Sequence, residues 1–576
     1  MYRVFGVNGP VVTIAGATAL RMMEMVYVGG SRLIGEVIGL DSNSTTIQVY
    51  EESAGLSAGQ NVHPTGELMS VTLGPGMLSN IYDGIQRPLK ALEDDSGAFI
   101  GRGCNLPALD EEKLWDVTIR VKVGDIVRGG DIAAICPETG SIEHRALVPP
   151  NLQGKIVEVR ENGRYTVCDT LAVLEDGQGN RHHLRLSHKW AIRVPRPVVR
   201  RFAPTKPLLT GQRVIDTLLP IAKGGAAAIP GGFGTGKTMT QHQLAKWCDA
   251  DIIVYIGCGE RGNEMTQVLH EFGELVDPKT GRPLSDRTIL IANTSNMPVA
   301  AREASIYTGI TIAEYYRDMG YHIAVMADST SRWAEALREI SGRLEEMPAD
   351  EGFPAYLPSR LAEFYERGGY VQNANGSEGS ITIIGAVSPQ GSDFSEPVTQ
   401  NTKRFTRCFW ALDKSLAYAR HYPAINWTES YSEYIVPLSA WYDENAGANF
   451  LTMRENIMKI LLEEDQLLEI VKLIGADVLP DEQKLVLETA KVIRAGFLQQ
   501  NAFHDVDTYV PLTKQREMMR VILLLHEKGR QLIMRQKPLT ELIKTGLFEK
   551  LTKMKYEIGN DDMTGFEDLA AKIERV

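Results

Sequence analysis

The chain has 576 residues, of which 43% are hydrophobic and 23% are charged, a composition typical of a soluble globular protein with several domains. Its 61 basic and 73 acidic residues give a net charge of −12, which argues against a broad nucleic-acid-binding surface. The six cysteines form no CxxC pair, which favours free thiols in a reducing compartment. No signal peptide is evident, and no run approaches the roughly 18 apolar residues of a membrane span. We therefore expect a cytoplasmic protein that meets a membrane only through its partners.

The first 70 residues predict a small β-barrel. Short β-rich runs at 11–14, 24–28, 34–38 and 45–50 are separated by Gly, Asn, Asp and Ser. Residues 71–114 then predict a connector, because turns surround Gly74-Pro75-Gly76.

Residues 115–190 are again rich in strand signals and predict a separate, inserted β module. Its three histidines, His182, His183 and His188, raise the alternative of a metal site. No Cys or carboxylate cluster accompanies them at ligand spacing, so the sequence disfavours that alternative.

Residues 191–430 predict a parallel sheet with helices on both faces. A proline-rich stretch at 194–207 favours an extended linker. Apolar strands at 251–256, 288–292, 323–327 and 381–387 then alternate with helical segments such as 299–319. From 431 to 576 the apolar spacing becomes helical, which predicts a C-terminal helical domain.

The segment 231–238, GGFGTGKT, fits the phosphate-binding loop pattern between a short apolar strand and a plausible helix. Its glycines allow a sharp bend that aims several backbone N–H groups at one polyphosphate. Lys237 is expected to bind the outer phosphates, and Thr238 to offer its hydroxyl to Mg²⁺ at a helix N-terminus. The predicted loop residues are Gly231, Gly232, Phe233, Gly234, Thr235, Gly236, Lys237 and Thr238.

Two acidic residues follow predicted strands of this sheet. Ligands of such sheets lie at the carboxyl ends of the strands, where Glu260 and Asp328 are expected. Asp328 is predicted to hold Mg²⁺ together with Thr238, although an aspartate here can also be a turn former. Glu260 is predicted to orient the attacking water, with a surface salt bridge as the alternative, and Arg261 to engage phosphate or a subunit boundary.

One further cluster joins His504, Asp505 and Asp507 within four positions. It raises a metal alternative, but helix or turn capping is the favoured interpretation.

Blocks along nearly the whole chain resemble the catalytic A subunits of archaeal and vacuolar-type rotary ATPases. These blocks are GPVV at 9–12, GPGMLSNIYDGIQRPL at 74–89, the phosphate loop, YIGCGERGNEM at 255–265, MADSTSRWAEALRE at 326–339, LPSRLAEFYERGGYV at 357–371, SDFSEPVTQNT at 392–402 and NAFHDVDTYV at 501–510.

The resemblance implies a role for each site residue. Lys237, Glu260 and Arg261 would be catalytic, with ATP or ADP and Mg²⁺ as cofactors. Tyr422 and Phe503 would enclose the adenine. A complete phosphate loop together with Glu260 distinguishes the catalytic subunits from the non-catalytic ones, and the module at 115–190 would be the outward bulge of this branch. Many eukaryotic relatives carry Cys where this chain has Thr235, so disulfide regulation there is not expected.

The resemblance also implies partners. The chain would form an A3B3 ring with a homologous B subunit, which would supply an arginine finger, and would act on central and peripheral stalks. A separate membrane sector would carry protons or sodium ions, and no nucleic acid is expected. Two alternatives remain open: a homohexameric relative working in protein export or RNA translocation, and a regulatory subunit that binds nucleotide without turnover.

Overall fold

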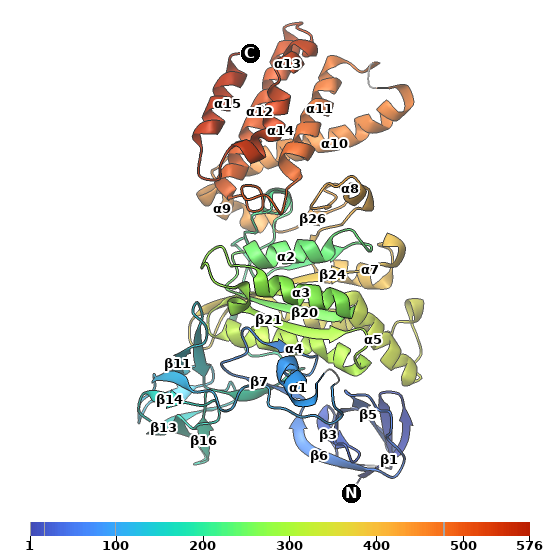
Figure 1. The fold of residues 1–576 in the computed structure, drawn as a ribbon, viewed down its shortest axis with the longest axis vertical. Helices are drawn as coiled ribbons and strands as arrows, with labels where there is room; N and C mark the ends of the chain where they lie inside the picture. Colours follow the sequence, from blue (N-terminus) through green and yellow to red (C-terminus); the bar gives the residue numbers. More distant parts are fainter. Residues whose placement is uncertain (1, 17, 98–99, 476–477) are drawn as a thin grey trace. The chain divides into compact units, whose positions relative to one another are not determined.

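The computed structural model describes residues 2–16, 18–97, 100–475 and 478–576. The chain forms two compact units, each built from separate stretches of sequence (Figure 1). Unit 1 comprises Met1–Phe202, Gly224–Ala226 and Ala250–Thr406, and unit 2 comprises Ala203–Lys223, Ala227–Asp249 and Arg407–Val576. In the described residues, no helix has the length and apolar character needed to span a membrane.

Unit 1 begins with a closed six-stranded barrel in the order β1-β2-β5-β4-β3-β6. Its strands are β1 (Tyr2–Asn8), β2 (Val11–Ala15), β3 (Glu24–Val28), β4 (Leu33–Leu40), β5 (Ser44–Val49) and β6 (Asn61–Leu68). Inward-facing residues such as Val12, Val26 and Ile47 are fully buried and fill the barrel. The predicted N-terminal barrel is confirmed.

A β-rich module follows and consists of two four-stranded sheets, ordered β10-β13-β15-β16 and β12-β11-β9-β14. The strands are β9 (Trp115–Ile119), β10 (Ile126–Arg128), β11 (Ile132–Pro137), β12 (Glu143–Leu147), β13 (Gln153–Val159), β14 (Gly163–Tyr165), β15 (Ala172–Glu175) and β16 (Arg181–Leu184). The module closes with β17 (His188–Ala191), which pairs with β7 (Ser70–Leu73).

The centre of unit 1 is a parallel sheet in the order β24-β22-β20-β21-β8. Its strands are β8 (Ile81–Tyr82), β20 (Ile252–Glu260), β21 (Thr288–Thr294), β22 (His322–Asp328) and β24 (Glu378–Val387), with β18 (Arg200–Phe202) and β23 (Gly369–Gln372) beyond β24. Helix α3 (Gly262–Glu274) covers one face, and α4 (Val299–Asp318) and α5 (Thr330–Arg343) cover the other (Figure 1). The remaining helices of unit 1 are α1 (Leu89–Ser96), α6 (Leu357–Glu366) and α7 (Pro397–Phe405).

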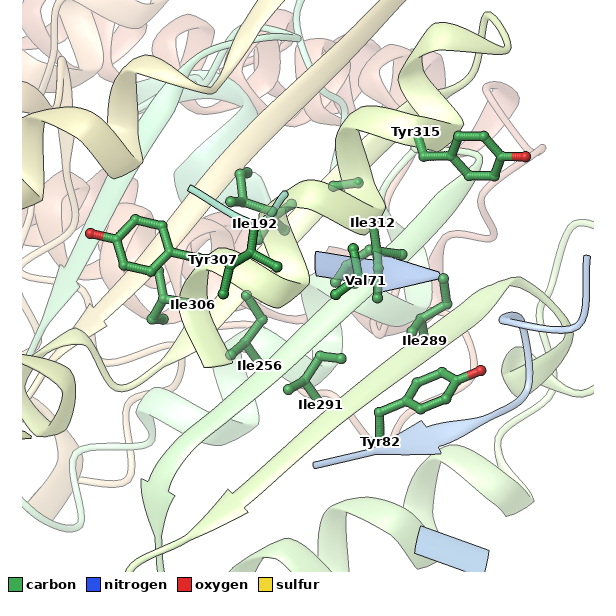
Figure 2. Close-up of a cluster of buried hydrophobic side chains, with 14 of the residues drawn as sticks. Val71, Tyr82, Ile192, Ile256, Ile289, Ile291, Ile306, Tyr307, Ile312 and Tyr315 are labelled. Atoms are coloured by element: carbon green, nitrogen blue, oxygen red, sulfur yellow. The ribbon is translucent and has the colours of Figure 1, made fainter. Parts of the chain in front are cut away.

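Buried aliphatic and aromatic side chains pack between this sheet and α4. Figure 2 shows Ile256, Ile289 and Ile291 of the sheet beside Ile306 and Ile312 of the helix. Because α4 is buried around nearly its whole surface, it lies at the centre of unit 1.

A buried ion network connects the barrel to α4. Arg193 donates to Glu36 of the barrel at 3.1 Å and to Glu303 of α4 at 2.7 Å. Tyr50 adds a hydrogen bond of 2.5 Å to the same Glu36 carboxylate. Removing the arginine would leave two buried carboxylates without their cation, so this network fixes the barrel on the sheet domain.

Unit 2 combines a small β element with a helical bundle. Its strands are β19 (Ala226–Pro230), β25 (Cys408–Phe409) and β26 (Tyr431–Ser432), and its helices are α2 (Lys237–Trp247), α8 (Lys414–Tyr418), α9 (Ile435–Asn445), α10 (Phe450–Ile474), α11 (Asp481–Val492), α12 (Leu512–Met534), α13 (Leu539–Lys544), α14 (Leu547–Glu557) and α15 (Thr564–Glu574). Two π-helical turns, Val214–Leu218 and Ile493–Leu498, interrupt the regular structure. The predicted helical C-terminus is confirmed.

The structure differs from expectation in three segments. The predicted connector contains β7, β8 and α1, and β8 extends the parallel sheet at its edge. The proline-rich stretch at 194–207 contains β18, which pairs with β23. Strand β20 continues four residues past the predicted end at 256, because a β-bulge near its end lets the pairing with β21 persist to Glu260.

Candidate functional site

The phosphate loop connects β19 to α2 within unit 2. Gly234 and Gly236 have φ angles of 79° and 89°, in the left-handed region that favours glycine. A Cβ at Gly231 would lie 2.6 Å from Thr235 Oγ1, so no larger residue fits there. The buried Thr235 hydroxyl donates to Gly232 O at 2.8 Å and holds the loop closed.

The lysine and the second threonine of the loop open helix α2. Lys237 Nζ donates to Gly231 O at 2.8 Å and to Gly232 O at 3.2 Å, so the ammonium lies against the loop itself. Thr238 is the second residue of α2, close to the backbone N–H groups of the helix N-terminus. Phe233 is 80% exposed at the tip of the loop.

A cavity of about 640 Å³ adjoins the loop, still within unit 2. Two loop glycines and the two predicted adenine-binding aromatics line it together; the full lining is Gln212, Ile215, Gly234, Gly236, Met239, Thr240, Gln243, Arg420, Tyr422, Pro423, Gln499, Gln500, Asn501, Ala502, Phe503 and Tyr556. A Cβ at Gly236 would lie 3.4 Å from the Tyr422 ring, so this ring lies directly against the loop. Phe503 is 86% exposed, so its ring is open to a ligand in the cavity.

Several lining residues were missed by sequence reasoning. Gln499, Gln500 and Tyr556 come from segments more than 250 residues beyond the phosphate loop, and no motif marks them. The π-helical turn Ile493–Leu498, which precedes Gln499, is the kind of irregularity common at functional sites, but its sequence has no distinctive signal.

Glu260 ends β20 in unit 1, immediately after a bulge. Gly259 has a φ of 72°, and the register against β21 shifts between Cys258 and Glu260. A Cβ at Gly259 would lie 2.7 Å from the Cβ of Arg332. Bulges redirect side chains, and this one turns Glu260 out of the regular alternation of the strand.

The Glu260 carboxyl lies in an environment that disfavours its charge. Burial, followed by the charge of Asp328 and a hydrogen bond with Glu264, raises its pKa to about 8, while Arg332 opposes the shift. A partly buried carboxylate with a strongly raised pKa at the end of a parallel strand is typical of a functional site.

Asp328 and Arg261 also belong to unit 1. Asp328 ends β22 and is 2% exposed, and its Oδ2 accepts a hydrogen bond of 3.1 Å from Tyr255. Arg261 is an exposed residue just before α3. Glu260 and Asp328 therefore lie at the carboxyl ends of the adjacent strands β20 and β22, and Arg261 directly follows β20.

Two oxygen donors of the kinds that Mg²⁺ prefers lie in separate units: the Thr238 hydroxyl in unit 2 and the Asp328 carboxylate in unit 1. Mg²⁺ is commonly held by one or two such groups together with substrate phosphates. Across residues 2–16, 18–97, 100–475 and 478–576, no group of three or more His, Cys, Asp or Glu side chains is arranged to hold a metal.

The histidine clusters of the sequence have protein partners. His182 pairs with Asp176 at 3.0 Å, and His188 contacts Arg196 at 3.1 Å. In the cluster at 504–507, His504 Nδ1 accepts a hydrogen bond from Val506 N at 3.2 Å, as a turn cap does. Asp507 accepts from Asn501 N at 2.7 Å and also pairs with the buried Arg213 at 2.5 Å.

Sequence models of known families match four consecutive regions. The β-barrel domain of the ATP synthase alpha/beta family matches residues 4–66, and the barrel-sandwich domain of its alpha/beta subunits matches residues 106–193. The nucleotide-binding domain of the same family matches residues 211–432, and the C-terminal domain of V and A type ATP synthase matches residues 439–543.

Curated relatives match the chain over almost its full length. The V-type ATP synthase alpha chain 2 of Clostridium tetani is 59% identical over 99% of this chain and 96% of its own length. The V-type ATP synthase alpha chain of Halothermothrix orenii is 60% identical over the same shares. The A-type ATP synthase of Methanopyrus kandleri has an A subunit that is 55% identical, again over 99% of this chain and 96% of its own length.

A solved structure, the assembled ATPase EscN of an enteropathogenic E. coli type III secretion system, covers 91% of this chain and 100% of its own length. Its TM-score is 0.64 at 20% identity, so this likeness concerns the fold alone. The family models and the full-length relatives, by contrast, agree on one assignment. The chain belongs to the ATP synthase alpha/beta family, in the branch of the A (alpha) subunits of V- and A-type ATP synthases.

Proposed function

We propose that this chain is the catalytic subunit of a V/A-type ATP synthase and couples ATP turnover to rotation of a central stalk. The observation that carries the proposal is a complete phosphate loop whose glycines also line an aromatic cavity. The loop suits a polyphosphate, and the cavity suits a purine base, so the two features together fit a nucleotide.

Unit 2 would bind the nucleotide. Lys237 and the N–H groups from Gly231 to Thr238 would hold the phosphates, with Lys237 leaving the loop carbonyls to meet them. Tyr422 and Phe503 would enclose the adenine, since both present exposed ring area to the cavity.

Glu260 and Arg261, which belong to unit 1, are the residues that we assign to hydrolysis. Glu260 would orient the attacking water, and its raised pKa suits a group that exchanges a proton with water near neutral pH. Arg261, exposed before α3, would stabilise charge on the γ-phosphate or reach the neighbouring subunit.

Thr238 and Asp328 would hold Mg²⁺, with Asp328 acting directly or through water. When bound, this ion neutralises charge on the phosphate oxygens.

The chain would work in a ring of three A and three B subunits, with an arginine finger supplied by each neighbouring B subunit. Such an arginine accelerates related NTPases by about 10³- to 10⁵-fold, so the isolated chain should turn over ATP slowly. Central and peripheral stalks would complete the machine, and a separate membrane sector would carry protons or sodium ions.

Native mass spectrometry of the chain isolated with its partners in Mg²⁺ and ADP tests this assembly. We expect three copies of this chain beside three copies of a related chain, and strong activation of ATP hydrolysis when the two are combined. Six identical copies would favour a homohexameric export or translocation ATPase instead. If the isolated chain hydrolysed ATP as fast as the assembled complex, the proposed contribution of a neighbouring B subunit to the site would be contradicted.

A further inference from the structure

Helix α14 of the C-terminal bundle contributes to the wall of the nucleotide cavity. Tyr556, near the end of this helix, lines the cavity together with Tyr422 and Phe503. The Tyr556 ring packs against the ring of His504, and the two ring centroids are 4.6 Å apart. His504 directly follows Phe503 in the sequence.

The preceding residue, Lys555, binds the backbone of the segment 495–499, which leads into the cavity wall. Its ammonium donates to Ala495 O at 2.7 Å and to Gln499 O at 3.0 Å, with the Gln499 side-chain oxygen at 3.4 Å. An ammonium has three N–H donors, and all three partners lie in the segment 495–499. Lys555 is only 3% exposed, so these bonds form away from water, where losing one is costly.

The segment that Lys555 holds leads directly into the cavity. Gln499, Gln500 and Asn501 line it and are followed by Phe503. Arg213 binds the same carbonyl, Gln499 O, at 2.8 Å and also binds Phe497 O. The two cations therefore fix the backbone immediately before the wall residues.

Asp507 fixes the same segment from its C-terminal side. Asp507 accepts from Arg213 at 2.5 Å and from Asn501 N at 2.7 Å. The loop that presents Phe503 is thus held on one side through Asp507 and on the other through Lys555. Of these two anchors, only Lys555 belongs to α14.

We propose that Lys555 is a positioning residue for the nucleoside: it fixes the 495–499 backbone so that Gln499 to Phe503 form the pocket wall, and it connects that wall to α14. The proposal rests on the proposed function, in which this cavity binds the adenine. Because coupling between two sites is reciprocal, a nucleoside that orders the wall also stabilises the Lys555 contacts and α14.

The direct test is Lys555→Met, with the Kd for ADP measured by calorimetry well below the melting temperature. We expect binding about tenfold weaker or more, because a small misplacement of a wall can cost this much. In the assembled complex KM for ATP should rise while kcat changes little, and Lys555→Arg should restore most of the affinity.

Two control variants separate positioning from general damage. Lys553 lies on α14 but pairs with Glu549 at 2.6 Å on an exposed face, so Lys553→Met should bind ADP normally. Lys514 is a buried lysine that donates to Ile558 O at 2.6 Å, to Asn560 Oδ1 at 3.2 Å and to the backbone oxygen of Lys555 at 3.3 Å. These bonds hold the end of α14 without reaching the segment 495–499. Lys514→Met should lower the melting temperature yet leave Kd within about threefold of the wild type.

Hydrogen exchange on the wild-type chain gives a second, independent readout if Lys555→Met does not fold. ADP should slow amide exchange in α14, Leu547–Glu557, but not in α13, Leu539–Lys544. Unchanged ADP affinity in a folded Lys555→Met variant, or no protection of α14 by bound ADP, would overturn the inference. A wild-type chain that binds no ADP would instead contradict the proposed function.

Discussion

The most discriminating prediction concerns Phe503, because the structure separates its effect on stability from its effect on binding. Its side chain is 86% exposed, so Phe503→Ala removes little buried area. Full burial of a phenylalanine contributes about 1.5–3 kcal/mol, so the loss in folding free energy should be about 0.2–0.4 kcal/mol. Stacking of a base on an aromatic ring contributes about 1–3 kcal/mol, which corresponds to about 5- to 150-fold in Kd.

The assay pairs a thermal melt with calorimetric titration of ADP into the isolated chain. Phe503→Ala should have nearly the same melting temperature as the wild type and bind ADP at least about fivefold more weakly. Tyr418 is a matched control, because it is 85% exposed in the same unit but does not line the cavity. Tyr418→Ala should change neither quantity, and wild-type ADP affinity in Phe503→Ala would refute the aromatic pocket.

Three further variants test the fold and the placement of Glu260. Arg193→Met should destabilise the chain by about 3–5 kcal/mol, seen as a lower melting temperature, because two buried carboxylates lose their cation; an unchanged melt would contradict the role of this network. Gly259→Ala forces a side chain into a left-handed backbone and against a neighbour, so turnover by the assembled complex should fall about tenfold or more while ADP binding by the isolated chain persists. Burial raises the pKa of Asp216 to about 6 against opposing hydrogen bonds. The folded state therefore binds the extra proton between about pH 4 and 6, and this group's contribution to stability is lost as pH rises through 6. We compare the free energy of unfolding of the wild type with that of Asp216→Asn at about pH 4 and about pH 7. The wild type should lose about 2–3 kcal/mol more than the variant over this range, and an equal loss in both proteins would contradict the raised pKa.

The sequence predicts most of the elements that carry chemistry, because their signals are local. The phosphate loop needs glycines at fixed offsets, and Asp328 follows a strand whose apolar run is unmistakable. The barrel and the long C-terminal helices follow from hydrophobic periods of 2 and 3.6 residues.

The parts that the sequence did not predict depend on contacts between distant segments. Strand β8 has only two residues and is a strand because it adds to the edge of β21. Tyr556 and Lys555 belong to an ordinary amphipathic helix. Only folding places Tyr556 in the cavity lining with Phe503 and Lys555 against the segment 495–499. The bulge at Gly259 is likewise set by pairing with β21, which no local pattern encodes.

The central claim is that this chain turns over ATP with Glu260 as the group that positions water. The most direct measurement compares ATP hydrolysis by assembled complexes that carry either wild-type chains or Glu260→Gln chains, with ADP affinity measured in parallel. The account predicts that kcat falls by about 10²-fold or more while ADP binds as in the wild type, since the glutamine keeps the shape of the side chain but cannot accept the proton. Turnover within about threefold of the wild type would contradict it.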